Sequence, residues 1–436
     1  MASLTVIRNP AEEALIARFP AAKASLPGNS AISALRERAF GVVRDKGLPH
    51  RRIEAYKYTD LRALMRDAAP LATEASGEGA ATPLVDGARL VFTNGWLSSN
   101  ANEGSMPVGV TATRMKDALI KGHPLIDAWF NKAAKLGGDD PALALNAAFM
   151  TDGVILQVAD GAEIERPILL EFNVEASTPV AVYPRILVAA GRGARATIIE
   201  HHRGPDGVAT QANSVFELIL GESADIQHVR LDETGNKALS LSSFAAHLGK
   251  ESLLSSLNFS SNPATARHQV FATFAGRDAK ASIRGAALLR GAQHADTTLV
   301  VDHVEPGGES RELYRTVLDG DSTGVFQGKI IVQQKAQKTD GRMASNALML
   351  SDGATMNNKP ELEIFADDVQ CAHGATVGAL DDNLLFYLMA RGISRKEAEA
   401  LMIASFAGEP IEPVSDESLR AALTARIDAW LKVRAA

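Results

Sequence analysis

The sharpest chemical feature of the sequence is the tripeptide Cys371-Ala372-His373. We expect it to continue the strand-like run 361–369, and residues two apart on a strand point to the same face. A thiol and an imidazole side by side are soft ligands that suit iron, copper or zinc. Two ligands cannot close a four-coordinate site, so a metal held here needs further ligands from elsewhere. From these residues alone, a buried cysteine beside a hydrogen-bonded histidine is the better-supported interpretation.

Three other groups of polar residues are weaker candidates for chemistry. Asp367 and Asp368 are adjacent, and adjacent strand residues face opposite sides of a sheet, so we predict a turn or cap role. The same objection applies to His201 and His202, either of which fits a solvent-exposed position. His303 fits the wall of a surface groove, although a lone histidine is more often structural.

The composition and the absent motifs exclude several classes of protein. The sequence contains no GxxxxGK[ST] phosphate loop, no HExxH and no GxSxG, so we predict neither a nucleotide site nor a catalytic triad, and no enzyme activity. A single cysteine excludes an intramolecular disulfide and any multi-thiolate site within one chain. The formal net charge of −7 argues against a general nucleic-acid binder.

The sequence also predicts a cytoplasmic protein. Residues 1–20 contain Glu12 and Glu13 and no continuous apolar segment, which argues against a signal peptide. No run approaches the roughly 18 apolar residues that cross a bilayer, so we expect no membrane association.

The stretch from about Asp152 to Asp368, which precedes Cys371 and His373, is rich in short strand-like runs. A unit recurs within it about every 30 residues, which is typical of a solenoid. The unit is an apolar run that ends in glycine, then a polar pair, then Ala or Ser and a new apolar run. Its glycines are Gly191, Gly221, Gly249, Gly276 and Gly308. We expect each glycine to permit a turn with positive φ.

Helical patterns flank this predicted β-solenoid. We divide the chain into a mainly helical region at 1–150, a β-helix core at 151–380 and a helical region at 381–436. The small-residue stretch 72–83 is typical of a linker. Ser394 and Glu397 form a capping box, and a second amphipathic helix is predicted over 416–433.

The chain resembles the SufB/SufD family of iron–sulfur cluster assembly proteins over nearly its whole length, most specifically from Phe326 to Ile393. The matching segments are 326–330 (FQGKI), 345–351 (SNALMLS), 359–364 (KPELEI), 366–378 (ADDVQCAHGATVG) and 386–393 (FYLMARGI). A weaker match covers 54–61 (EAYKYTDL), where the family more often has Trp at Ala55 or Tyr56. SufB-type chains are typically longer and richer in cysteine, so the chain is more similar to the SufD branch.

The resemblance implies a mainly β protein, a right-handed parallel β-helix flanked by helical regions. It also implies a scaffold in a complex with SufB and the ABC ATPase SufC, on which a cluster forms transiently, with no cofactor held tightly by the isolated chain. His373 is then an iron or cluster ligand at the subunit interface, with Cys371 beside it. SufC would dock on 381–413, at Leu385, Phe386, Tyr387, Arg391, Gly392 and Ile393. We expect truncation after Leu380 to abolish docking and leave the solenoid folded.

Two other interpretations remain open from the sequence. One is a parallel β-helix enzyme acting on carbohydrate, although no cluster of acidic or basic catalytic residues is visible. The other is a purely structural homodimer whose β-helix edges pair, without any part in metal handling. In either the homodimer or the assembly role, we expect the isolated chain to self-associate.

Overall fold

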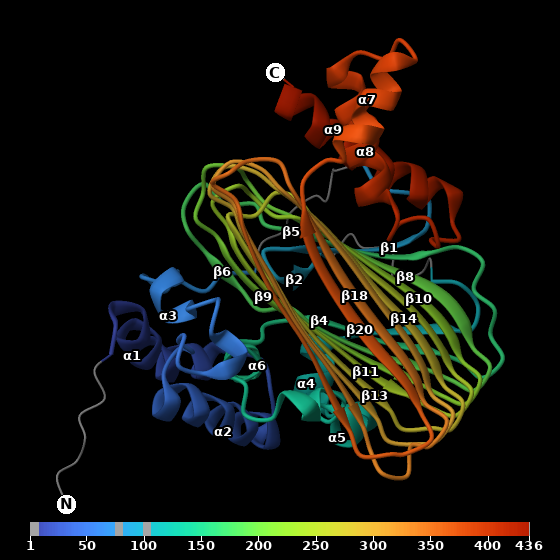
Figure 1. Cartoon of the computed structure of the whole chain (residues 1–436). Coiled ribbons are helices and arrows are strands. Elements are labelled where there is room, and N and C mark those ends of the chain that lie inside the picture. Colours follow the sequence, from blue (N-terminus) through green and yellow to red (C-terminus); the bar gives the residue numbers. More distant parts are fainter. Residues whose placement is uncertain (1–7, 75–81, 99–105, 436) are drawn as a thin grey trace, which may run out of the picture.

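A computed structural model describes residues 8–74, 82–98 and 106–435 (Figure 1). Residues 75–81 of the predicted linker and the first seven residues lie outside this description. Within the described ranges, no helix combines the length and hydropathy of a membrane-spanning segment.

The core is a flattened parallel β-solenoid, so the predicted mainly β fold is confirmed. Two sheets extend along its length and face each other, and each coil contributes one strand to each sheet. In order, sheet B contains β2 (Trp96–Leu97), β1 (Ala88–Thr93), β5 (Ile168–Asn173), β8 (Arg195–Arg203), β10 (Asp225–Glu233), β12 (Leu253–Ser260), β14 (Lys280–Leu289), β16 (Glu309–Leu318), β18 (Asp340–Met349) and β20 (Gln370–Gly378).

Sheet A faces sheet B across the core. In order, it contains β19 (Thr355–Ile364), β17 (Thr323–Val332), β15 (His294–His303), β13 (Thr265–Phe274), β11 (Leu239–Leu248), β9 (Gln211–Leu220), β7 (Arg185–Ala190), β4 (Gly153–Val158) and β3 (Val110–Arg114), with β6 (Ala181–Val182) beside β9. Strands β1 to β3 belong to the region predicted as mainly helical, so strand structure starts before residue 151.

The recurring glycines lie at one corner of the coils, directly before sheet-B strands, but not for the predicted reason. The amide nitrogens of Gly221 and Gly249 donate to the carbonyl oxygens of Ala190 and Leu220 at 2.8 and 3.0 Å. A Cβ on Gly276 would lie 2.0 Å from the backbone nitrogen of Lys250, so close stacking of coils excludes any side chain there.

Positive φ occurs two residues after four of these glycines, at Gly193 (64°) and at three non-glycine residues. The non-glycine residues are Ser223 (56°), Glu251 (55°) and Asp278 (59°). The expectation that the glycines themselves adopt positive φ is therefore wrong for all five.

The N-terminal helices cover the outer face of sheet A, at the lower left of Figure 1. They are α1 (Pro10–Ser25), α2 (Ser30–Lys46), η1 (Glu54–Tyr56), α3 (Leu61–Leu64), α4 (Met115–Lys121), α5 (Pro124–Trp129), η3 (Ala133–Gly137) and α6 (Pro141–Phe149). A buried polar contact fixes the motif at 54–61 to the sheet. Arg267 stacks on the Tyr56 ring at 3.9 Å and pairs with Asp296, which also accepts a hydrogen bond from Thr59.

Two of the three C-terminal helices, α8 (Arg395–Gly408) and α9 (Glu417–Ala435), cover the outer face of sheet B, and α7 (Asp382–Ala390) packs against α8. The Ser394–Glu397 capping box is present. Leu423 and Ile427 of α9 are buried in one cluster with sheet residues such as Leu257. Truncation after Leu380 would expose that apolar face of sheet B, so it should also lower the stability of the solenoid.

Candidate functional site at the last coil

Cys371 and His373 lie on β20, the edge strand of sheet B at the C-terminal end of the solenoid. The prediction that they continue the strand at 361–369 is wrong, because β19 ends at Ile364 and a turn leads into the other sheet. The prediction that the side chains of Cys371 and His373 point to the same face of the strand still holds. Cys371 pairs with Gly341 and His373 with the buried Met343, so both occupy inward-facing positions of the last coil.

The two candidate ligands differ in their environments. Cys371 is partly buried and packs against the main core cluster. Burial raises the pKa of its thiol, and the nearby carboxyl groups of Asp340 and Glu312 raise it further. His373 is exposed, because no further coil covers it. A cation that neutralised the acidic surroundings would favour the thiolate, which is the form that binds metal.

The last coil cannot complete a metal site by itself. Across the part of the chain that the structure describes, no three His, Cys, Asp or Glu side chains are grouped to hold a metal ion. Among the described residues, no strand pairs with the outer edges of β19 and β20. Further ligands would therefore have to come from a molecule that docks against this end of the solenoid.

Behind the last coil lies a buried acid that the sequence analysis did not single out. Glu312 of β16 precedes Met343 and His373 in one inward-facing row across three strands. It is 2% exposed, and neither carboxyl oxygen has a hydrogen-bond partner among the described residues. Burial raises the pKa of Glu312 to about 8. The period-two pattern of the strand places Ser310, Glu312 and Tyr314 on one face, and this signal could have identified it.

The neighbours of Glu312 offer it little compensation. The Ser310 hydroxyl lies 3.1 Å from Nε2 of His303, and Ser310 lowers the pKa of Glu312 by less than burial raises it. The Tyr314 hydroxyl is also buried without a partner, and burial together with Glu312 raises the pKa of Tyr314. The interior next to the candidate ligands therefore contains polar groups that are not satisfied within the chain.

Earlier coils contain a second interior polar cluster. Glu200 accepts contacts from His202 at 3.1 Å and from His228 at 2.9 Å. Arg230 donates to Asp232 at 3.1 Å. Burial alone would raise the pKa of both acids, but these partners hold the pKa of Glu200 below its usual value and lower that of Asp232 to about 2.

The structure assigns the weaker candidates to structural roles. Asp368 lies in the turn before β20 and pairs with Lys338, so its predicted turn role is confirmed. His201 and His202 are 1% and 3% exposed, so the expected solvent-exposed position is wrong for both. His303 is fully buried and stacks on Phe274 at 4.1 Å, so it lines no surface groove.

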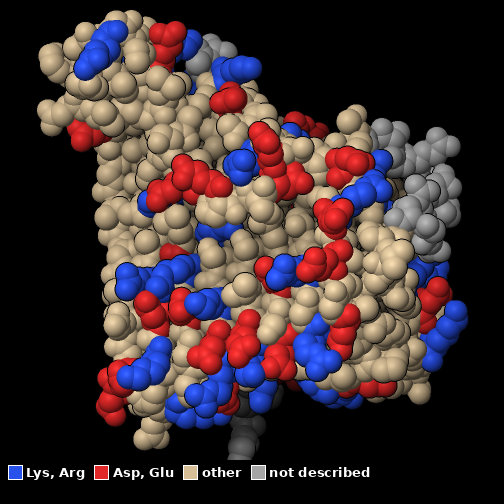
Figure 2. Space-filling model, turned by 90° about the vertical axis from the view of Figure 1, so that its right-hand side faces the viewer, with Lys and Arg blue, Asp and Glu red and all other residues tan. Residues whose placement is uncertain are grey.

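The proposed docking residues lie on or next to α7, in a projection that carries few charged side chains at the upper left of Figure 2. Phe386 and Tyr387 are 74% and 53% exposed. Arg391 donates to the Tyr387 hydroxyl at 2.8 Å, and Gly392 ends the helix with φ of 86°. Further large apolar side chains are exposed at Leu384, Met389 and Leu401.

Two residues of the predicted docking set are less accessible than the rest. Leu385 is only 2% exposed, so it supports α7 from within and offers no surface to a partner. Ile393 is partly buried. Helix α7 therefore has a buried side, which contains Leu385, and an exposed side that carries the other apolar residues.

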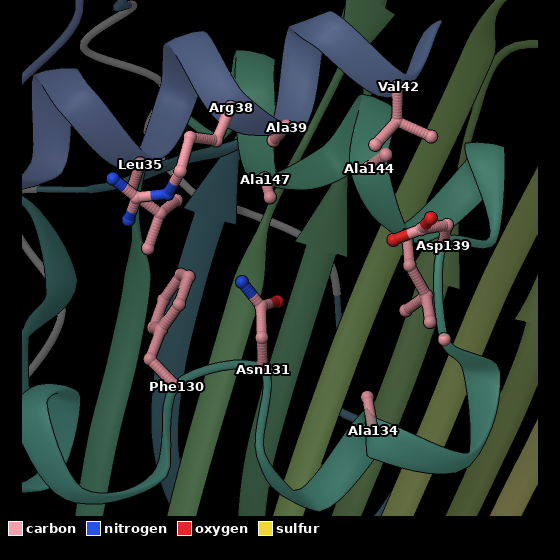
Figure 3. Close-up of a pocket in the computed structure, with 12 residues that line it drawn as sticks. Leu35, Arg38, Ala39, Val42, Phe130, Asn131, Ala134, Asp139, Ala144 and Ala147 are labelled. Atoms are coloured by element: carbon pink, nitrogen blue, oxygen red, sulfur yellow. The ribbon is translucent and has the colours of Figure 1, made fainter. Parts of the chain in front are cut away.

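A cavity of about 370 Å³ lies on the opposite flank, between α2, η3 and α6. Figure 3 shows its small apolar lining, including Ala39, Ala134 and Ala147, with Arg38 and Asp139 at its rim. None of its lining residues belongs to the last coil, so it is separate from the Cys371–His373 pair.

Comparison with models of known protein families identifies the family of this chain. A model described as "SUF system FeS cluster assembly, SufBD core domain" matches residues 172–406, and one described as "SufBD protein N-terminal region" matches 80–170. The chain belongs to the SufBD family. It is therefore an iron–sulfur cluster assembly protein of the SufD-like type.

Curated relatives extend this family assignment over most of the chain. The chain is 32% identical over 400 residues to the iron–sulfur cluster assembly protein SufD of Escherichia coli, covering 87% of this chain and 89% of that protein. A SufBD family iron–sulfur cluster assembly protein of Synechocystis is 30% identical over 405 residues, covering 89% and 88%. SufD of Bacillus subtilis is 26% identical over 333 residues, 74% of each chain.

Proposed function

We propose that this SufBD family chain is a non-catalytic scaffold that works with a SufB-like paralogue and a SufC-like ABC ATPase. The observation that carries the proposal is the incomplete ligand set at the open end of the solenoid. His373 is exposed there, Cys371 lies two residues away, and the unpaired edges of β19 and β20 can accept another β-structure. A paralogue docked at this edge would supply the missing ligands for a transient cluster.

ATP hydrolysis is assigned to the partner because the sequence contains no phosphate loop. The exposed apolar residues of α7 support a protein contact at this place, since such a patch is typical of an interaction site. In the absence of partners, we expect two copies to pair through the same solenoid edge. A cytoplasmic location fits a single free cysteine, because reducing conditions keep the thiol available.

The ligand assignment is tested with His373→Ala in the reconstituted complex. An alanine offers no nitrogen to iron, so we expect less bound iron and sulfide per complex with an unchanged melting temperature. Cys371→Ala should have a smaller effect, because a partner thiolate is the expected sulfur ligand. Gln370→Ala, on the opposite face of the same strand, is the matched control. Normal iron loading of His373→Ala would refute the assignment.

The docking surface is tested with Phe386→Asp. A charged group in the middle of the apolar patch should weaken ATPase capture by about tenfold or more, without destabilising the chain, because Phe386 is 74% exposed. Leu253→Asp is the control, since Leu253 is an exposed apolar residue of the solenoid at 41%. Equal capture of the ATPase by both variants would place its docking site elsewhere.

A further inference from the structure

A second cavity, of about 280 Å³, lies where α9 crosses three successive coils. Its solenoid side is formed by the ends of β10, β12 and β14 and the residues that follow them. The lining residues are Glu233, Ser261, Asn262, Arg290, Arg426, Ala429, Trp430 and Val433. It shares no residue with the last coil, and nothing in the assembly role requires it.

Two buried donors of this cavity have no acceptor. Nη1 of Arg290 and Nε1 of Trp430 lack a hydrogen-bond partner among the described residues. Trp430 is only 4% exposed, so solvent does not readily satisfy its indole N–H. A buried donor without a partner costs about 1–3 kcal/mol, which a bound acceptor would recover.

The local charge also favours an anion. Arg426 contributes a second guanidinium, which reaches Glu233 only at 3.3 and 3.4 Å. Glu233 is the one carboxylate among the lining residues, and its Oε2 already lies 2.6 Å from Nε2 of His201. The lining residues therefore include two guanidinium groups and one carboxylate, and that carboxylate is already in contact with Arg426 and His201.

The remaining wall is apolar. Ala429, Trp430 and Val433 present one side of α9 to the cavity. Guanidinium groups bind carboxylate and phosphate through paired N–H donors, and a flat indole suits the carbon skeleton of a small ligand. The cavity thus combines an anion-binding end with an apolar side.

We propose that this cavity binds a small organic anion that carries a carboxylate or phosphate group. The charged group lies between Arg290 and Arg426 and accepts the Trp430 N–H, and the rest of the ligand contacts α9. A bound ligand would join α9 to three coils of sheet B at once, so it should also stabilise the folded chain.

Isothermal titration calorimetry of the full chain tests this with citrate and inorganic phosphate as probes. We expect citrate to bind with a Kd below about 1 mM, and Arg290→Met to weaken it by about tenfold or more. Trp430→Phe, which keeps a ring and loses the N–H, should weaken it by about threefold to tenfold. Arg290→Met removes no hydrogen bond made by Nη1, so it should fold, and its melting temperature without ligand checks this.

Arg192→Met is the matched control, because Arg192 is exposed and lies outside the cavity. Its citrate affinity should equal that of the wild type. The proposal is overturned if neither probe binds at about 10 mM, or if Arg290→Met and Arg192→Met bind citrate equally well. Phosphate that binds more tightly than citrate would overturn the assignment of an organic ligand.

Discussion

The interior of the solenoid contains two groups of buried polar residues that differ in how they are satisfied. In the early coils, Glu200 and Asp232 are ionised and have histidine, arginine and hydroxyl partners. In the later coils, Glu312 is equally buried but has no hydrogen-bond partner among the described residues. The same side chain, glutamate, thus has its pKa lowered in one place and raised in the other.

The difference shows which part of the interior is complete within one chain. A satisfied cluster fixes neighbouring coils to one another and needs no ligand. Glu312 lies two strands away from Cys371 and His373, and its unsatisfied carboxyl group lowers the stability of the fold. Unsatisfied buried groups of this kind are typical of functional sites. Substitutions with opposite expected effects on the two groups test this contrast.

The largest effect is expected for Arg230→Met in the early cluster. It leaves Asp232 buried with only hydroxyl and backbone donors, and the loss of one partner of a buried ion pair costs about 3–5 kcal/mol. Urea unfolding should show a correspondingly lower midpoint. The exposed Arg192→Met should lie within about 0.5 kcal/mol of the wild type. A loss below about 1 kcal/mol for Arg230→Met would mean that the cluster is not satisfied as described.

Glu312→Gln should instead stabilise the protein above neutral pH. The folded pKa of about 8 exceeds the ordinary 4.5, so the folded chain keeps a proton that the unfolded chain releases between these values. The stability contributed by the neutral carboxyl is full below pH 4.5 and is lost as pH rises toward 8. The variant should remove this loss, which reaches about 3 kcal/mol by pH 7.

Glu200→Gln is the matched comparison, and its expected effect on the free energy of unfolding has the opposite sign. It removes a carboxylate that two histidines contact, so it should destabilise the fold by about 1–3 kcal/mol at neutral pH. Unfolding curves for both glutamine variants at pH 5 and pH 9 distinguish the two environments. Parallel pH profiles for Glu312→Gln and the wild type would show that Glu312 is not neutral in the folded protein.

The smallest effect is expected for Tyr314→Phe. The Tyr314 hydroxyl has no hydrogen-bond partner in the described ranges, so its removal should change the free energy of unfolding by less than about 1 kcal/mol, toward stabilisation. Differential scanning calorimetry is sufficient to measure it. A clear destabilisation would indicate a bound water or ligand that the hydroxyl contacts.

The sequence predicted the repeated features of the fold better than the single ones. Recurrent glycines identified the solenoid and its corners, because close stacking of neighbouring coils leaves no room for a side chain at these positions. The pairing of Cys371 with His373 on one face followed from strand periodicity alone. Three-dimensional neighbours could not be predicted this way: the burial of Leu385 depends on α7 packing, and the cavity at Arg290 and Trp430 joins segments about 140 residues apart in sequence.

The stacking of coils at the corner glycines also bears on how the molecule comes apart. Each coil contacts its neighbours in a linear array, so opening should proceed from whichever end lacks a neighbour. That end is β20, which carries His373, while helices pack on the outer faces of the array. Amide hydrogen exchange should accordingly be fastest in β19 and β20 and slow toward the centre of the sheets. A subunit that docks there would act as the missing terminal repeat, and the candidate ligands would become rigid at the moment the complex forms.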